Sequence, residues 1–353
     1  MSAAPQPRPL RAGVVGLGMM GRHHVRVWDE SVPGVELVAT ADPDPDTLRR
    51  TTAGRRARGY ADAERMFAQE ELDLVSIVAP TSLHLPVTLA ALRAGANVLV
   101  EKPIAATREE ATSMIAAAAE AERMLTVGHI ERFNPAMREL RRRLVAGELG
   151  RIFQIHATRL GPFPARIRDV GVVVDLAPHD LDIMRYLVGS EPIRIYAETE
   201  RRIHTEHEDL FNGIMKFANG VIGILDINWL TPTKRRTLTV TGERGMYVAD
   251  YIDQDLIFYA NLDAAQVWRR RGDDGTGVPV TSVAEGEMTR RLIRREEPLV
   301  VELTAFAQAV REEGPPPVEP HDAMVALLLA RKMVESADTG QVIDGRALAE
   351  VLS

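Results

Sequence analysis

The chain has 353 residues, 45% of them hydrophobic, so it can bury a sizeable core and should divide into two domains. Its net charge of −7 argues against nucleic-acid binding, and the absence of cysteine excludes disulfides, thiolate zinc sites and a cysteine nucleophile. Residues 1–11 lack the apolar core of a signal peptide, and no apolar run reaches the roughly 18 residues that a spanning helix requires. We therefore expect a disordered N-terminal tail and a cytoplasmic protein that binds neither nucleic acid nor membrane.

A glycine-rich turn follows the first apolar strand, at residues 12–15. In it, Gly16 allows a tight turn, Gly18 lets backbone N–H groups approach a pyrophosphate, and Gly21 lets the next helix pack closely. Asp42 closes the next apolar run, 21 residues beyond Gly21, where a carboxylate can bind the ribose hydroxyls of adenosine and repel a 2′-phosphate. This arrangement predicts a bound dinucleotide, with NAD favoured over NADP.

Apolar runs and helical segments alternate after this turn. The runs 72–79, 97–100 and 124–127 alternate with helical segments such as 85–94 and 108–122, a pattern that predicts a doubly wound parallel sheet of the α/β Rossmann type. Ligands of such sheets lie beyond the carboxyl ends of the strands. Cofactor contacts are therefore expected from Gly16, Gly18, Met19, Met20, Gly21, Asp42, Pro80, Thr81, His84, Glu101 and Lys102.

A different pattern, with an apolar residue at every second position, begins near residue 151. It predicts a large, mostly antiparallel open sheet in an α+β domain, with helices near 173–187, 299–311 and 321–336. We expect a dinucleotide-binding domain at 12–133 and a substrate-binding and oligomerisation domain at 134–353; packing of the C-terminal helices back on the first domain is left open. An uncovered sheet face favours a homodimer or homotetramer.

Other histidines and charged segments receive simpler interpretations. His204 and His207 could suggest zinc, but their spacing of three in a loop or strand start does not place both rings on one face, so we expect no metal. His23 and His24 are expected to be exposed on the helix after the glycine turn. Residues 269–275 are expected to form a mobile surface loop, because their charges and glycines bury little.

Three residues are candidates for proton chemistry. Lys102 follows a buried strand and precedes Pro103, and a lysine can act as a base when its pKa is lowered. The alternative is an exposed lysine on a turn, which its position at the carboxyl end of a buried strand disfavours. Asp175 and His179 lie four residues apart, so in a helix they share a face, and a carboxylate beside an imidazole orients it as a general base. A helix-start capping role for this pair is the alternative.

These motifs together resemble those of the Gfo/Idh/MocA family of sugar and cyclitol dehydrogenases. The resemblance rests on the glycine turn, Asp42, Glu101-Lys102-Pro103, Gly128-His129 and the Asp175/His179 pair, in that order, and it spans nearly the whole chain. It implies that Lys102, Asp175 and His179 are catalytic and act at the nicotinamide ring of NAD.

A narrower likeness, carried by the segments 128–135, 161–169 and 204–209, is to members that oxidise the C3 hydroxyl of UDP-N-acetylglucosamine to a ketone. It fits a nucleotide-sugar substrate, because guanidinium groups such as those of Arg166 and Arg168 bind pyrophosphate, although both could lie on a solvated loop. The alternatives are a dehydrogenase of a free sugar or inositol and a non-catalytic dinucleotide sensor. The expected substrate contacts are Arg132, Asn134, Arg166, Arg168, Asp175 and His179; Arg132 and Asn134 could instead cap the next helix.

Overall fold

The computed structural model describes residues 8–164, 170–204, 206–261 and 286–352. They form two compact units. The first comprises the residues up to Phe133 together with Glu296–Leu328, and the second comprises Asn134–Arg295 and the residues from Leu329 onward. The segment 269–275, expected to be a mobile loop, lies outside the described residues.

The first unit is built on a six-stranded sheet in the order β3-β2-β1-β4-β5-β6, and every strand pairing in it is parallel. The predicted doubly wound sheet is thereby confirmed. The strands are β1 (Leu10–Val15), β2 (Val35–Ala41), β3 (Arg58–Tyr60), β4 (Leu74–Ile77), β5 (Asn97–Glu101) and β6 (Leu125–Gly128). The helices are α1 (Met19–Glu30), α2 (Pro45–Thr52), α3 (Ala63–Gln69), α4 (His84–Arg93), α5 (Arg108–Glu120) and α9 (Pro298–Arg311), with short 3-10 turns η1 (Thr81–Leu83) and η2 (Ile130–Phe133).

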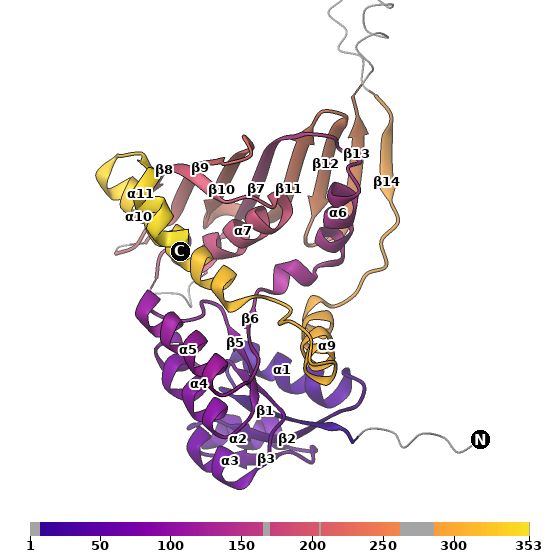
Figure 1. The fold of residues 1–353 in the computed structure, drawn as a ribbon, viewed down its shortest axis with the longest axis vertical. Coiled ribbons are helices and arrows are strands. Elements are labelled where there is room, and N and C mark those ends of the chain that lie inside the picture. Colours follow the sequence, from indigo (N-terminus) through magenta and orange to yellow (C-terminus); the bar gives the residue numbers. More distant parts are fainter. Residues whose placement is uncertain (1–7, 165–169, 205, 262–285, 353) are drawn as a thin grey trace, which may run out of the picture. The chain divides into compact units, whose positions relative to one another are not determined.

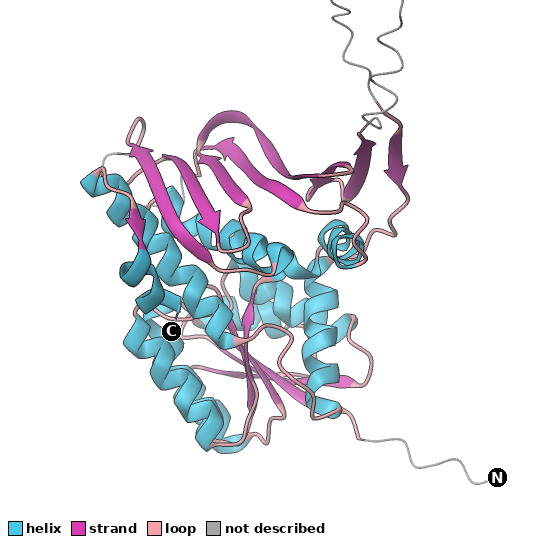
Figure 2. Cartoon of the chain, turned by 45° about the horizontal axis from the view of Figure 1, so that its top comes forward, coloured by secondary structure: helices cyan, strands magenta, loops and turns pink. Residues whose placement is uncertain are grey.

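Helices cover both faces of this sheet (Figure 2), which is why β4 and β6 are buried at every residue. Along β5, Val98 and Val100 belong to one buried cluster and Leu99 belongs to the cluster on the opposite face. Helix α9 joins the second cluster although it comes from the C-terminal third of the chain. There the ring of Phe306 meets Trp28 edge-on at 6.4 Å between centroids.

The second unit is built on a nine-stranded sheet in the order β14-β13-β12-β11-β7-β10-β9-β8-β15 (Figure 1). All its pairings are antiparallel except that between β7 and β10, so the predicted mostly antiparallel sheet is confirmed. The strands are β7 (Ile152–Pro162), β8 (Pro192–Glu200), β9 (Leu210–Phe217), β10 (Ile222–Asn228), β11 (Leu230–Gly242), β12 (Gly245–Asp250), β13 (Asp255–Ala260), β14 (Met288–Arg291) and β15 (Ile343–Asp344). The helices are α6 (Pro135–Val145), α7 (Val172–Val188), α11 (Gly345–Leu352) and the part of α10 (Pro320–Thr339) that follows Leu328.

The two faces of this sheet differ. Helices α6 and α7 lie against one face (Figure 1), where Ile155, Leu225 and Leu238 are buried. The other face carries apolar side chains that stay exposed, among them Ile214 at 53% and Met288 at 61%. These side chains favour association with another copy, but the expected homodimer or homotetramer stays a prediction.

A spanning segment was not expected from the sequence. Within the described residues, no helix has both the length and the apolar character needed to cross a bilayer.

Candidate active site

The turn after β1 approaches its neighbours so closely that side chains are excluded. Gly16 has φ of +87°, and a Cβ there would lie 2.7 Å from the backbone of Val78 and Ala79. A Cβ on Gly21 would lie 1.9 Å from the carbonyl oxygen of Gly16, so only glycine lets α1 start this close to the strand end. Gly18 has no neighbouring atom within 4 Å of the Cβ position, which leaves open space in front of the turn.

The N-terminus of α1, like those of α4 and α9, has no side-chain cap. Asp44, Asp62 and Thr107 cap α2, α3 and α5 with their side chains, whereas Gly18 gives α1 no side-chain cap. The first N–H groups of α1 therefore keep their donor capacity, and they lie at the positive end of the helix dipole. Such an end binds the pyrophosphate of a dinucleotide.

A cavity of about 640 Å³ adjoins this turn, and Asp42 lies in its wall. One carboxylate oxygen of Asp42 accepts from the N–H of Leu17 at 2.7 Å and the other from the N–H of Asp44 at 2.9 Å. Asp62 is a second carboxylate in the wall, and none of the described residues that line the cavity is basic. An acidic wall fits ribose hydroxyls and disfavours a 2′-phosphate, as NAD binding requires.

The predicted cofactor contacts divide into two groups. Gly16, Gly18, Asp42 and Pro80 line the cavity, but Met19, Met20, Gly21, Thr81, His84, Glu101 and Lys102 do not. The sequence analysis missed part of the wall, which comes from the turn before α3 and from the end of β4. The signal for the first part is Asp62, a capping residue just after the short strand β3; the missed lining residues are Val15, Ala41, Pro43, Ala61, Asp62, Ala63, Val78, Ala79, Leu83 and Val87.

His84 connects two loops and is only 1% exposed. Its Nε2 lies 3.0 Å from the carbonyl oxygen of Ala79, and its Nδ1 lies 3.0 Å from that of Pro103. Burial lowers the pKa of His84 more than these carbonyl groups raise it. His84 thus holds the turn after β4 against the Lys102-Pro103 turn, so it positions cavity residues from behind the cavity wall.

Glu101 ends β5 next to Lys102, and its carboxylate is held from two sides. His24 Nε2 lies 3.0 Å from its Oε1, and the N–H of Lys102 donates to its Oε2 at 3.2 Å. Burial raises the pKa of Glu101, but the His24 hydrogen bond and the charges of His24 and Lys102 outweigh it and leave the pKa lowered. A Cβ on Gly128 would lie 3.0 Å from this carboxylate, which accounts for glycine there.

The expected exposure of His24 is wrong. His23 is exposed, but the side chain of His24 is fully buried because it turns inward to reach Glu101, 77 residues away in sequence. Lys102, which directly follows the last residue of β5, is half-buried.

Asp175 and His179 lie one turn apart on α7 in the second unit, and both are half-buried. The start of this helix is held by Glu208, whose carbonyl oxygen accepts from the N–H of Val172 at 2.9 Å and whose carboxylate accepts from the N–H of Val173 at 3.2 Å. A Cβ on Gly171 would lie 2.0 Å from that carboxylate, so glycine leaves room for the capping group.

Local hydrogen bonds hold residues 202–204 and 206–209 next to the start of α7. Asp209 is fully buried and accepts from three consecutive N–H groups, those of residues 202–204, at 2.5 to 3.0 Å. His204 Nδ1 accepts from the N–H groups of Glu206 and His207. The histidines of this segment thus shape the loop that caps α7.

A buried ion pair fixes α7 to the sheet. Arg159 on β7 donates through Nε and Nη2 to the two carboxylate oxygens of Asp180, at 2.7 and 3.0 Å. The side chains are 3% and 1% exposed. Because Asp180 follows His179 directly, this pair sets the position of the predicted base.

The remaining predicted substrate contacts have other placements. Arg132 is buried in the first unit and donates to Asp322 at 3.0 Å. Asn134 is also buried: its Oδ1 caps α6 by accepting from Ala136 N–H, and its Nδ2 donates to the carbonyl oxygen of Tyr251. These contacts favour the capping alternative for Asn134. Arg166 and Arg168 lie outside the described residues.

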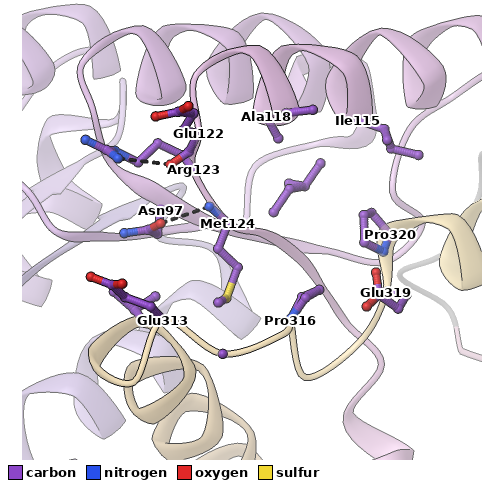
Figure 3. Close-up of a pocket in the computed structure, with 14 residues that line it drawn as sticks. Asn97, Ile115, Ala118, Glu122, Arg123, Met124, Glu313, Pro316, Glu319 and Pro320 are labelled. Carbon is purple, nitrogen blue, oxygen red and sulfur yellow. Dashed lines mark hydrogen bonds between the residues drawn. The ribbon is translucent and has the colours of Figure 1, made fainter.

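Figure 3 shows a second cavity in the first unit, of about 650 Å³. It lies at the amino ends of β5 and β6, whereas the glycine turn lies at the carboxyl end of β1. Its wall includes Asn97 at the start of β5 and Met124 before β6, joined by a hydrogen bond from Met124 N–H to Asn97 Oδ1 at 2.9 Å. Ligands of parallel sheets bind at the carboxyl ends, so this cavity is not the cofactor site.

Comparison with known proteins gives results in keeping with this geometry. Residues 10–129 match the family model described as "Oxidoreductase family, NAD-binding Rossmann fold", and residues 137–248 match the "GFO/IDH/MocA C-terminal domain". The UDP-N-acetylglucosamine 3-dehydrogenase of Acidithiobacillus ferrooxidans is 32% identical over 250 residues, covering 71% of this chain and 77% of that protein.

Two further matches describe the range of relatives. Inositol 2-dehydrogenase 2 of Saccharopolyspora erythraea is 31% identical over 224 residues, covering 62% of this chain and 66% of that protein. Among solved structures, UDP-N-acetylglucosamine 3-dehydrogenase GnnA from Acidithiobacillus ferrooxidans matches with a TM-score of 0.81 at 27% identity, covering 94% of this chain and 98% of that chain.

Proposed function

Because the chain belongs to the Gfo/Idh/MocA family of NAD-binding oxidoreductases, we propose that it oxidises a secondary alcohol of a nucleotide sugar, namely the C3 hydroxyl of UDP-N-acetylglucosamine. The observation that carries this substrate assignment is the 32% identity to a UDP-N-acetylglucosamine 3-dehydrogenase over 71% of the chain. The product is the 3-keto sugar.

The side chains are assigned separate parts of this reaction. His179 accepts the hydroxyl proton, and Asp175 orients the imidazole and stabilises its protonated form. Lys102 donates a hydrogen bond to the reacting oxygen and helps set its acidity. NAD, when bound, supplies the hydride acceptor. Lys102 is the alternative proton acceptor, because a lysine in a suitable environment can also serve as a base.

A dehydrogenase of inositol or a free sugar is the second candidate, favoured by the 31% identity to an inositol 2-dehydrogenase. The two candidates differ in whether the substrate carries a nucleoside diphosphate. The non-catalytic sensor is a third reading, which the presence of Lys102, Asp175 and His179 together disfavours.

The test is an assay of NADH formation by the purified full-length chain with NAD and four substrates: UDP-N-acetylglucosamine, UDP-glucose, N-acetylglucosamine and myo-inositol. We expect turnover with UDP-N-acetylglucosamine and far less with the free sugar. Turnover of myo-inositol without turnover of either nucleotide sugar would establish the second candidate. Binding of NAD with no turnover of any substrate would favour the sensor.

A further inference from the structure

A third cavity, of about 300 Å³, lies within the second unit and has Asp175 in its wall. The end of β7 contributes Gly161 to it, and the loop that follows contributes Phe163. Trp229 and the first half of β11 form the remaining side, and the rings of Trp229 and Phe163 meet edge-on at 5.9 Å. The volume lies at the lower end of the range for ligand sites, which typically combine apolar walls with a few polar groups.

A bulge in β11 places a lysine in this wall. Leu230 pairs with Pro162 and Arg235 pairs with Leu160, so the single residue Gly161 lies opposite residues 231–234. The extra residues leave the plane of the pairing, as bulges beside active sites do to redirect a side chain. Lys234 ends this bulge, and its Cγ lies 3.7 Å from the position that a Cβ on Gly161 would take.

Asn228 stabilises the bulge from the end of β10. Its Oδ1 accepts from the N–H of Leu230 at 3.0 Å, from the N–H of Thr231 at 3.1 Å and from the hydroxyl of Thr231 at 2.9 Å. Asn228 itself lines the cavity. The start of the bulge is therefore held by a specific local network that includes a residue of the cavity wall.

The wall holds more cations than carboxylates, because Asp175 is the one acidic residue among the described residues that line it. Arg159, Lys234 and Arg236 are its three cations. The charge of Arg159 is balanced by Asp180 through two buried hydrogen bonds. Lys234 is exposed and makes no ion pair within the part of the chain that the structure describes. Arg235, between the other two β11 cations, does not line the cavity, as expected from the alternation of side chains along a strand.

We propose that this cavity is the diphosphate subsite of the substrate site, and that Lys234 and Arg236 are the residues that select a nucleoside diphosphate sugar over a free sugar. This inference rests on the proposed function. Two cations in the same wall as Asp175 place an anion-binding group beside the helix that carries His179. Ammonium and guanidinium groups are the usual ligands of phosphate oxygens in proteins.

The test is calorimetric titration of the full-length wild-type protein and its variants with UDP, a probe that carries the diphosphate but no sugar. We expect Lys234→Ala and Arg236→Ala each to weaken UDP binding about tenfold or more, because each loses a charge-assisted contact. Arg235→Ala is the matched control, with an expected change of less than about twofold since a surface substitution typically has a small effect. Lys234→Arg should restore most of the affinity, and melting temperatures check that each variant folds.

Steady-state kinetics separate a subsite from a structural role. In Lys234→Ala the KM for UDP-N-acetylglucosamine should rise about tenfold while kcat stays within a few fold, because the lost contact is to the diphosphate and not to the reacting hydroxyl. Equal UDP affinity in Lys234→Ala, Arg236→Ala and Arg235→Ala, or no UDP binding by the wild-type protein, overturns the subsite even if UDP-N-acetylglucosamine is oxidised. UDP binding that depends on both residues, without oxidation of any nucleotide sugar, leaves the subsite standing and overturns the proposed reaction.

Discussion

The cavity beside the glycine turn of the first unit is shaped by close backbone approaches, whereas helix α7 of the second unit is held by ionised side chains. In the first unit, Gly16 and Gly21 allow approaches that no other residue permits, and Gly18 leaves a helix end uncapped. In the second unit, α7 depends on the Arg159–Asp180 pair and on the Glu208 cap. A backbone-built site tolerates few substitutions at its glycines, while a site held by side chains can be dismantled one partner at a time.

The difference also concerns distance along the chain. Gly16, Gly21 and Asp42 lie within one strand–helix–strand segment, so their spacing is visible in the sequence. Arg159 and Asp180 come from different elements, 21 residues apart, and Gly171 makes room for a carboxylate 37 residues further on. The position of α7 is therefore determined by pairs that no local pattern contains.

The largest effect is expected from the predicted base of the second unit. His179→Ala should lower kcat about 10²–10⁴-fold, the usual contribution of a general acid–base group, with whichever substrate the NADH assay identifies. NAD affinity, measured by calorimetry, should stay unchanged because the described cofactor cavity is built only from first-unit residues. Lys102→Ala should also lose turnover.

His321→Ala provides the control, since His321 is exposed at the start of α10. It should keep wild-type turnover and NAD affinity. If His179→Ala keeps most of its activity, the assignment of the proton acceptor to His179 is wrong, and a much larger loss in Lys102→Ala would transfer that role to Lys102.

The next effect concerns stability rather than chemistry. Asp180→Ala leaves the buried guanidinium of Arg159 without its carboxylate, so the free energy of unfolding of the second unit should fall by about 3–5 kcal/mol. Urea denaturation followed by circular dichroism measures this loss. Combining Asp180→Ala with Arg159→Met should recover part of it, because the uncompensated charge is removed.

A surface ion pair in the same unit provides the control for the stability loss in Asp180→Ala. Glu335→Ala breaks the partly exposed Lys332–Glu335 pair on α10 and should cost no more than about 1 kcal/mol. A comparable cost in Asp180→Ala would mean that the Arg159 charge is satisfied by other groups and that this pair does not hold α7.

The sequence predicted most of what local patterns encode. The glycine turn, Asp42, the parallel sheet and the long strands from Ile152 to Tyr259 all follow from spacing and periodicity. The two-residue strand β15 and the polar strand β14 carry too little pattern to detect, and the parallel pairing of β7 with β10 depends on long-range register.

The misjudged residues share one cause. His24 looks like a surface residue from its helix, but a carboxylate from another strand draws it inward. The bulge that carries Lys234 is likewise visible only once β7 and β11 are paired, since nothing in residues 230–235 alone marks the extra residues. The prediction for His24 was wrong, and the bulge at Lys234 was missed, because in both cases the partner that determines the structure lies far away in sequence.

The smallest effect on stability is expected from Glu302 in the first unit, a buried ionisable side chain without a compensating partner among the described residues. Glu302 on α9 is 1% exposed, and neither of its carboxylate oxygens has a hydrogen-bond partner among the described residues. Burial and the nearby charges of Glu101 and Glu131 raise the pKa of Glu302 well above its ordinary value. The folded state therefore binds a proton that the unfolded chain releases, and stability declines as pH rises from the unfolded-state pKa through the folded-state pKa.

Glu302→Gln removes this titration, so the variant should gain about 1–3 kcal/mol over the wild-type protein at pH values above the folded-state pKa and little or nothing in acid. Thermal unfolding across a pH series measures the difference. Glu312→Gln, at the exposed end of the same helix, should change stability by less than about 0.5 kcal/mol at every pH. A gain in Glu302→Gln that does not vary with pH would mean that the pKa of Glu302 is the same in the folded and unfolded states. A loss at neutral pH would mean that the folded state stabilises the negative charge of Glu302 instead of disfavouring it.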